Sequence, residues 1–175
     1  MRKNWGWWQW AGFIFSTLAG TLLHFAYDWS GGSPLVAPFA ALNESTWEHM
    51  KLLFLPTFLY AIAQSFLFKD REDFWCIKLK GILLGLTLIP TIFYTYNGVF
   101  GRSPDWLNIS IFFISAATVF IYETRLFNSK KPCRISKKWA LSLLFAIAVM
   151  FIIFTFRTPR LNVFKDPITS AYGIQ

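Results

Sequence analysis

The chain has 175 residues, of which 55% are hydrophobic, 20% aromatic and only 15% charged. This composition excludes an ordinary soluble domain, in which charged residues make up about a quarter of the chain. The net charge of +8 does not indicate nucleic-acid binding, because the basic residues are confined to short segments between long uncharged runs.

Five uncharged runs are long enough to cross a membrane. The hydrocarbon core of a bilayer requires a helix of about 20 apolar residues, and about 17 suffice when flanking Lys and Arg side chains reach the headgroups. We therefore predict an all-α, polytopic membrane helix bundle that forms a single domain over residues 1–175. The predicted transmembrane helices cover about residues 7–27, 46–67, 74–96, 106–122 and 139–156, and an outer C-terminal tail covers residues 158–175.

The first predicted helix carries His24 and Asp28 near its end, four residues apart and therefore on one face. The connection that follows, residues 28–45, is rich in Gly, Pro and Ser, but residues 35–42 within it are apolar and uncharged. Exposure of an apolar segment to water is unfavourable. We expect this segment to lie in the membrane interface or to fold back onto the bundle.

The second predicted helix has a clear start. Residues 45–48 have the S-x-x-E form of a capping box, in which Ser45 is the N-cap and Glu48 reaches back to the backbone. Lys51 lies three residues after Glu48 and can pair with it.

The later helices carry weaker signals. In the third helix, Gly81 and Gly85 have the spacing that lets two helices approach closely. The fourth helix is expected to begin at Ser103 as the cap, with Pro104 in the first position. The tail after the fifth helix is too apolar for a solvated end, so we expect it to dock over the mouth of the bundle.

All nine tryptophans lie near a predicted helix end, where an amphipathic indole settles at the headgroup level. Most basic residues gather on one side of the predicted bundle: Arg2, Lys3, Lys69, Arg71, Lys78, Lys80, Arg125, Lys130, Lys131, Arg134, Lys137 and Lys138. The opposite side has fewer: Arg102, Arg157, Arg160 and Lys165. The positive-inside rule then predicts a cytoplasmic N-terminus and an outer C-terminus. Cys76 and Cys133 fall on the cytoplasmic side, where we expect two reduced thiols.

The segment over residues 43–51 packs two carboxylates, an imidazole and an amine into nine residues. Such groups are costly at the edge of a bilayer and call for a physical reason. His24 lies one turn before the outer end of the first helix, and His49 lies one turn into the second helix from the same side. The two imidazoles are therefore expected at similar depth.

Three hypotheses account for this cluster. Two imidazoles and a carboxylate are suitable ligands for a divalent metal such as zinc, and an open coordination position could activate water. In that case His24, His49 and Glu44 are the candidate ligands, and Glu48 or Glu44 is the candidate general base. The spacing does not match the H-E-x-x-H motif.

The second hypothesis gives the cluster a structural role only, with Glu48 capping its helix and the polar side chains joining the ends of the first two helices. The third makes it a binding or proton-relay site at the mouth of a transport path. Deeper polar groups such as Gln64, Tyr94 and Asn97 are compatible with that path and with hydrogen bonds between helices.

Three segments, over residues 24–31, 43–51 and 166–173, resemble those of a family of small, uncharacterised bacterial integral membrane proteins, a domain-of-unknown-function family. The resemblance covers the whole chain. It implies several spanning helices in the bacterial cytoplasmic membrane and no known activity. Ser170 stands where the family is expected to have Gly. All three segments fall on the outer side of the predicted topology.

We therefore expect an outward-facing polar pocket that binds a lipid headgroup, an ion or a small solute. Its candidate binding residues are His24, Asp28, Asn43, Glu44, Glu48, His49 and Lys51. The alternatives are a metal-dependent membrane hydrolase and a structural or accessory membrane subunit, so the composition and motifs leave open whether the protein is an enzyme.

Overall fold

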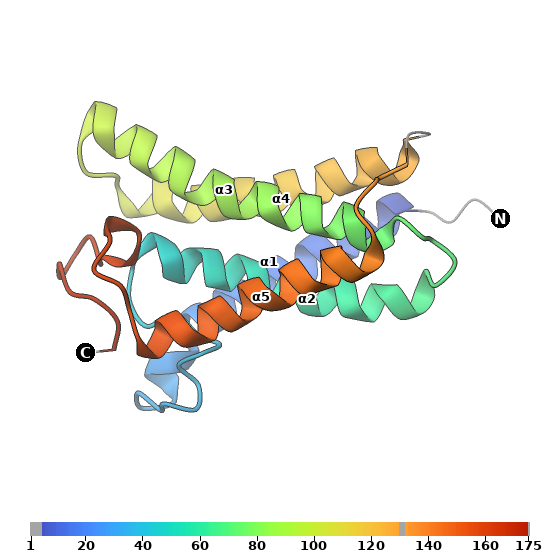
Figure 1. Ribbon diagram of the computed structural model, residues 1–175. Coiled ribbons are helices and arrows are strands. Elements are labelled where there is room, and N and C mark those ends of the chain that lie inside the picture. Colours follow the sequence, from blue (N-terminus) through green and yellow to red (C-terminus); the bar gives the residue numbers. More distant parts are fainter. Residues whose placement is uncertain (1–4, 130–131, 175) are drawn as a thin grey trace.

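The computed structural model describes residues 5–129 and 132–174, and its described part is all-α (Figure 1). The elements are α1 (Trp5–Trp29), α2 (Thr46–Leu67), α3 (Phe74–Phe100), α4 (Asp105–Asn128), α5 (Lys137–Phe156) and the short 3₁₀-helix η1 (Asn162–Phe164). The predicted all-α fold is confirmed, and each predicted segment lies within one helix. Four basic residues used in the topology prediction, Arg2, Lys3, Lys130 and Lys131, lie outside the described residues.

Four of the helices, α2 to α5, are long and apolar enough to cross a membrane. Helix α1 has sufficient length, with 25 residues, but its Trp, Gly, Ser and Thr residues lower its mean hydropathy. The chain thus has the helices of a membrane protein. A fifth span through α1 and the orientation of the termini stay predictions.

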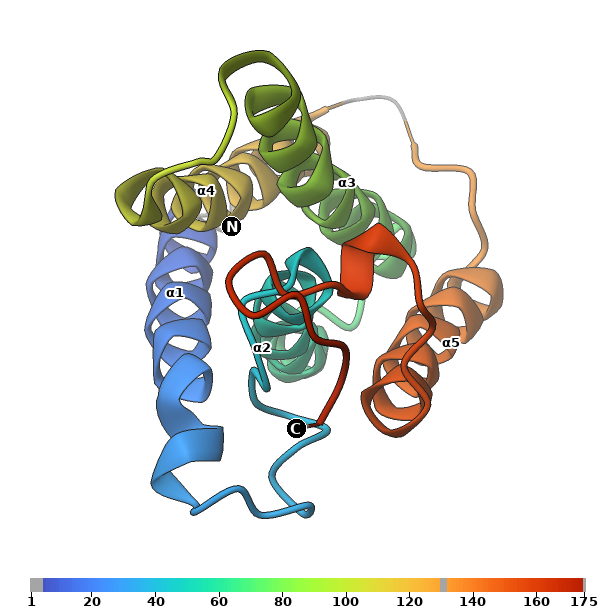
Figure 2. The same cartoon turned by 90° about the vertical axis from the view of Figure 1, so that its left-hand side faces the viewer.

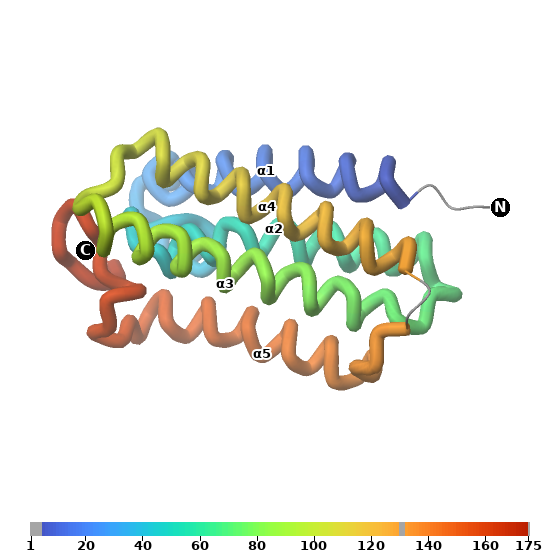
Figure 3. Tube along the Cα trace, turned by 90° about the horizontal axis from the view of Figure 1, so that it is seen from above, coloured from blue at the N-terminus to red at the C-terminus, as the bar shows by residue number. Residues whose placement is uncertain are grey.

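Helix α2 occupies the centre of the bundle. Figure 2 looks along the helices and shows α1, α4, α3 and α5 arranged around it, with α1 and α5 on opposite sides. Successive helices run in opposite directions (Figure 3). We call the end of the bundle that carries the C-terminal tail the tail end, and the opposite end the disulfide end.

Glycines allow close helix packing in the centre. A Cβ atom at Gly81 would lie 2.6 Å from the side chain of Glu123, and one at Gly85 would collide with Val119 and Leu53. Both contacts lie on faces of α3 that meet its neighbours. The predicted close approach at Gly81 and Gly85 is therefore confirmed.

The connection between α1 and α2 folds back onto the bundle, as expected. Ala37 and Ala40 are completely buried, and the carbonyl of Ala37 accepts a hydrogen bond from Lys51 Nζ at 3.0 Å. Leu35 and Phe39, from the same apolar segment, are exposed.

The C-terminal tail packs across the tail end (Figure 2). Phe164 of η1 is buried against Trp47, and Asn43 Nδ2 donates a hydrogen bond to the carbonyl of Gly173 at 3.2 Å. Within the tail, Ser170 has a φ of 61°, in the left-handed region that favours glycine. This backbone conformation explains why glycine is the expected residue at that position.

The two cysteines are not reduced thiols in this structure. Cys76, in the first turn of α3, forms a disulfide with Cys133, in the segment that leads to α5. Their Cα atoms are 5.9 Å apart, which suits a disulfide. The expectation was wrong because it rested on the charge-derived side of the membrane alone. The antiparallel pair α3 and α4 returns the chain to the beginning of α3, and this brings the cysteines together.

The disulfide and the charges make opposite predictions for the disulfide end, because disulfides persist in oxidising compartments while basic loops remain in the cytoplasm. In a Cys76→Ser/Cys133→Ser background, the charge rule predicts that Leu161→Cys is labelled by a membrane-impermeant maleimide in intact cells. It predicts that Glu72→Cys is labelled only after permeabilisation. Neither substitution removes a basic residue. The reverse labelling pattern would invert the topology and place the disulfide on the oxidising side.

Candidate functional site

A cavity of about 370 Å³ lies at the tail end, between α1, α2, α3 and α4. Tail residues Pro167 and Ile168 also contribute to its lining. One part of the lining is apolar, with Leu52, Phe93 and Phe112 on three different helices. The polar lining residues are Thr21, His24, Glu44, His49, Asn97, Arg102, Ser103, Asp105 and Asn108.

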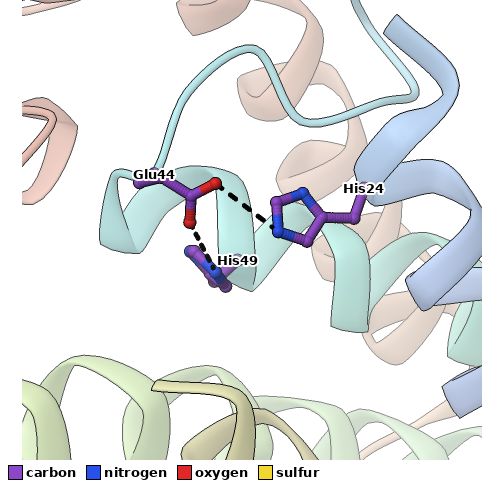
Figure 4. Close-up of side chains that lie close together, drawn as sticks. All are labelled: His24, Glu44 and His49. Carbon is purple, nitrogen blue, oxygen red and sulfur yellow. Dashed lines mark ion pairs between the residues drawn. The ribbon is translucent and has the colours of Figure 1, made fainter. Parts of the chain in front are cut away.

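Three of these polar residues form one compact group (Figure 4). His24 Nε2 lies 3.5 Å from Glu44 Oε1, and His49 Nε2 lies 3.6 Å from Glu44 Oε2. One ligand atom from each residue lies within 4.8 Å of the other two. Ligand atoms bound about 2 Å from a tetrahedral ion are about 3.3 Å apart, so small side-chain rotations would bring all three onto one metal ion.

Each residue of the group is positioned differently. His24 comes from the last turns of α1, His49 from the first turn of α2, and Glu44 from the connection just before α2. His49 Nδ1 lies 3.0 Å from the carbonyl of Ser45. A carbonyl can only accept, so Nδ1 carries the proton, and Nε2 is the ring nitrogen that faces Glu44. Such a backbone hydrogen bond is typical of metal-binding histidines.

Of the two hydrogen bonds of the predicted capping box at the N-terminus of α2, one forms in the structure. Ser45 is the N-cap, and its Oγ accepts a hydrogen bond from the Glu48 backbone N–H at 3.4 Å. The Glu48 carboxylate accepts instead from the Leu42 backbone N–H at 3.2 Å, so the capping box does not close on Ser45. The Ser45 N–H donates to Asn43 Oδ1 at 2.9 Å.

Glu48 and Lys51 form a buried ion pair of their own. The Lys51 Nζ lies 2.6 Å from Glu48 Oε2, and it also donates to Thr155 Oγ1 of α5 at 3.3 Å. The predicted pairing is confirmed, and both residues are almost fully buried. Among the described residues, neither lines the cavity. This pair therefore joins α2 to the connection before it and to α5.

The predicted site residues thus separate into two sets. His24, Glu44 and His49 meet at the cavity, whereas Glu48 and Lys51 pair behind it. Asp28 is exposed at the end of α1 and is not part of the cavity lining that the structure describes. Asn43 holds the tail through Gly173.

The ends of α3 and α4 and the connection between them contribute a polar wall, of which the sequence had indicated Asn97 alone, as a group compatible with a transport path. Asn97 Oδ1 accepts from the Ser103 backbone N–H at 2.8 Å, and Ser103 Oγ lies 2.8 Å from Asn108 Oδ1. Arg102 and Asp105 line the cavity beside them. Ser103 was expected to cap α4, but Pro104 is the N-cap residue. The sequence signal that could have indicated this wall was the presence of polar residues at both ends of a short connection.

A second buried ion pair was also missed. Lys78 Nζ of α3 lies 2.6 Å from Glu123 Oε2 of α4, and both side chains are completely buried. Lys78 was counted only as a basic residue next to the membrane. Glu123 directly follows the span predicted over residues 106–122 and was treated only as the charge that ends its uncharged run.

Fold and site together define a helical protein with four helices able to span a membrane and a cavity, lined by polar and apolar side chains, at one end of the bundle. The chain matches the Family of unknown function (DUF6512) over residues 2–174, and it belongs to that family. The resemblance to an uncharacterised family is thereby confirmed. Comparisons with curated proteins and with solved structures found no match.

Proposed function

We propose that this is a multi-pass protein of the bacterial cell membrane whose outward-facing cavity binds a divalent metal ion such as zinc, and through it an anionic small solute or lipid headgroup. The observation that carries the proposal is the convergence of His24, Glu44 and His49, whose ligand atoms lie within 4.8 Å of one another. Two imidazoles and one carboxylate are a ligand set that zinc accepts.

The position of this group supports a role in binding a further ligand. Three protein ligands leave one position of a tetrahedral ion open, and the group forms part of the cavity wall. Arg102 lines the same cavity, and a guanidinium pairs well with carboxylate and phosphate groups. The apolar lining by Phe93 and Phe112 suits the uncharged part of such a ligand.

The hydrolase alternative draws on the same open position, where a bound water could be activated. Its candidate base Glu48 is engaged by Lys51 at 2.6 Å, and its other candidate, Glu44, is one of the three metal ligands. The geometry therefore supports binding better than hydrolysis. The accessory-subunit alternative draws on the Glu48–Lys51 pair, which joins elements without reaching the cavity.

Metal analysis of the purified protein tests the proposal. After loading with zinc and removal of unbound metal, we expect one zinc ion per chain in the wild type. His24→Ala and His49→Ala should each weaken zinc binding by at least about 100-fold, since even changes around a ligand cost 10–100-fold.

The matched control is Glu72→Ala, which removes an exposed carboxylate at the disulfide end and should leave zinc binding unchanged. A wild-type protein that retains no zinc under these conditions would contradict the proposal. So would equal zinc retention by both histidine variants.

A further inference from the structure

Three hydroxyl groups in the bundle differ from the rest. Many Ser and Thr side chains in these helices donate a hydrogen bond to a carbonyl one turn earlier, as Ser110 does to Trp106 at 2.8 Å. Ser16 of α1, Thr57 of α2 and Ser115 of α4 are at most 1% exposed. Their hydroxyls have no hydrogen-bond partner among the described residues.

Glycines in α1 fix the depth of these hydroxyls. Gly12 packs against the ring of Tyr60 of α2, and Gly20 packs against the backbone carbonyl of Leu52. Ser16 lies halfway between the two glycines. Because α1 and α2 are antiparallel, Ser16 is level with the turn of α2 that carries the unpartnered threonine.

The same two glycines relate α1 to α4. The ring of Phe120 packs on Gly12, and the ring of Phe112 packs on Gly20. The α1 serine is therefore also level with Ser115. Three helices thus place a buried, unpartnered hydroxyl at one depth, in the middle of the bundle.

A second layer lies two helical turns closer to the disulfide end. Gln9 precedes the α1 hydroxyl by seven residues, Gln64 follows the α2 hydroxyl by seven, and Glu123 follows the α4 hydroxyl by eight. The side-chain amides of both glutamines and the Oε1 atom of Glu123 are buried and make no hydrogen bond of good geometry in the described structure, although the Gln9 amide approaches Glu123 and the Gln64 amide approaches Tyr60. Glu123 Oε2 is the oxygen that binds Lys78.

The third layer is the cavity at the tail end. His24, His49 and Asn108 each lie seven or eight residues from the unpartnered hydroxyl of their own helix, and all three line the cavity. Two helical turns separate successive layers on every helix. Polar side chains therefore recur at three depths from the cavity to the buried ion pair, and the rings packed on Gly12 and Gly20 lie between these depths.

Buried polar atoms without partners destabilise a protein unless ordered water satisfies them, and buried water typically makes about three hydrogen bonds. We propose that α1, α2 and α4 enclose a column of internal water that connects the cavity with the Lys78–Glu123 pair. Along this column, Glu123 exchanges protons with the cavity. The inference does not depend on a metal ion at His24, Glu44 and His49.

The proposed proton transfer conserves protons and charge. A proton that arrives along the water column binds Glu123 Oε1 and converts the carboxylate into a neutral acid, and the same path returns it to the cavity. Lys78 keeps its positive charge. Four rings, those of Tyr60, Phe74, Phe120 and Phe127, have centroids 5.6–5.9 Å from Lys78 Nζ, and ring faces stabilise a buried cation.

The surroundings of Glu123 contain few other titratable groups. From α3 it faces Lys78, and from α2 it faces Tyr60. Helix α1 contributes Gln9, whose amide lies beside the carboxylate. Lys78 is the charged group among these neighbours. A change in the charge of Glu123 therefore alters the electrostatic environment of Lys78 most.

The sign of a stability change tests the water column. Removal of an unpartnered hydroxyl from a dry core should raise Tm, whereas removal of a hydroxyl that binds water should lower it. We expect Ser16→Ala and Ser115→Ala to lower Tm. The matched control is Ser110→Ala, on the same helix as Ser115, whose hydroxyl binds its own helix. An unchanged or raised Tm in both column variants would overturn the hydrated column.

Infrared difference spectroscopy tests the proton exchange. When the medium is acidified, the wild-type protein should gain the carbonyl band of a buried carboxylic acid, and it should lose this band when the pH is restored. The band should be smaller in Lys78→Met/Glu123→Gln, which removes both charges and so leaves no unpaired ion in the core, while the buried Glu48 remains in both proteins. A wild-type spectrum without this band, or a band of equal size in the double variant, would overturn the proposal for Glu123.

Discussion

Glu123→Gln is expected to destabilise the folded protein by about 3–5 kcal/mol, because it leaves a buried ammonium without its counter-ion. Lys78 Nζ lies 2.6 Å from Glu123 Oε2, and neither side chain is exposed. Helices α3 and α4, which the pair joins, pack along their lengths. Chemical or detergent-induced unfolding, followed by tryptophan fluorescence, measures the change in the free energy of unfolding.

Two variants calibrate this result. Lys78→Met/Glu123→Gln should recover most of the lost stability, since it removes the unpaired charge. Asp73→Asn breaks the Arg71–Asp73 pair, which has the same 2.6 Å distance but is partly exposed, and it should cost at most about 1 kcal/mol. If Glu123→Gln costs no more than Asp73→Asn, the Lys78–Glu123 pair is not buried as described.

Glu48→Gln and Glu44→Gln are expected to have opposite effects, although the two residues are four apart on the chain. Glu48→Gln leaves Lys51 buried without its counter-ion and should cost about 3–5 kcal/mol of stability, with zinc binding retained. Glu44 has a side chain that is 39% exposed, so Glu44→Gln should leave stability nearly unchanged. Because an amide is a poor zinc ligand, the same variant should weaken zinc binding strongly.

Both variants need both measurements, the free energy of unfolding and the zinc content. A folded Glu48→Gln protein that has lost its zinc would return Glu48 to the metal-binding group. A Glu44→Gln protein that is strongly destabilised would show that the His24–Glu44–His49 group serves packing. In that case the accessory-subunit hypothesis would be the better account of the tail end.

The two ion pairs have different relations to function. Glu48–Lys51 joins α2 to α5 and to the preceding connection, and every bond of Lys51 that the structure describes is made within that junction. In the Lys78–Glu123 pair, the Oε1 atom of Glu123 lies outside the bond to Lys78, and the amide of Gln9 lies beside the carboxylate. An ionisable group inside a membrane protein is costly and is typically retained for a function. Of the two pairs, the latter is therefore the better candidate for one.

Much of the fold could be predicted from the sequence, because the signals are local. Long uncharged runs placed the five helices, since each run is bounded by charges that avoid a bilayer interior. The site was predicted in part for the same reason. His24 lies near the end of one helix and His49 near the start of the next, so a connection of ordinary length returns them to one end of the bundle.

Contacts between residues that are far apart in the sequence could be identified from the tertiary structure but not from the sequence. Lys78 and Glu123 are 45 residues apart, and Cys76 and Cys133 are 57 apart. Their pairing depends on the rotation and register of α3 against α4, which Gly81 and the contacts around it decide.

The division of the polar segment over residues 43–51 has the same origin. The sequence determined that Glu44, Glu48 and His49 share one end of the bundle. The tertiary structure decided that Glu44 lies before α2 and meets both histidines, whereas Glu48 lies within α2 and turns toward Lys51. Spacing along a chain limits which side chains can share a helix face. Which neighbour that face meets is decided by the packing of helices whose contacts are not encoded in any one segment.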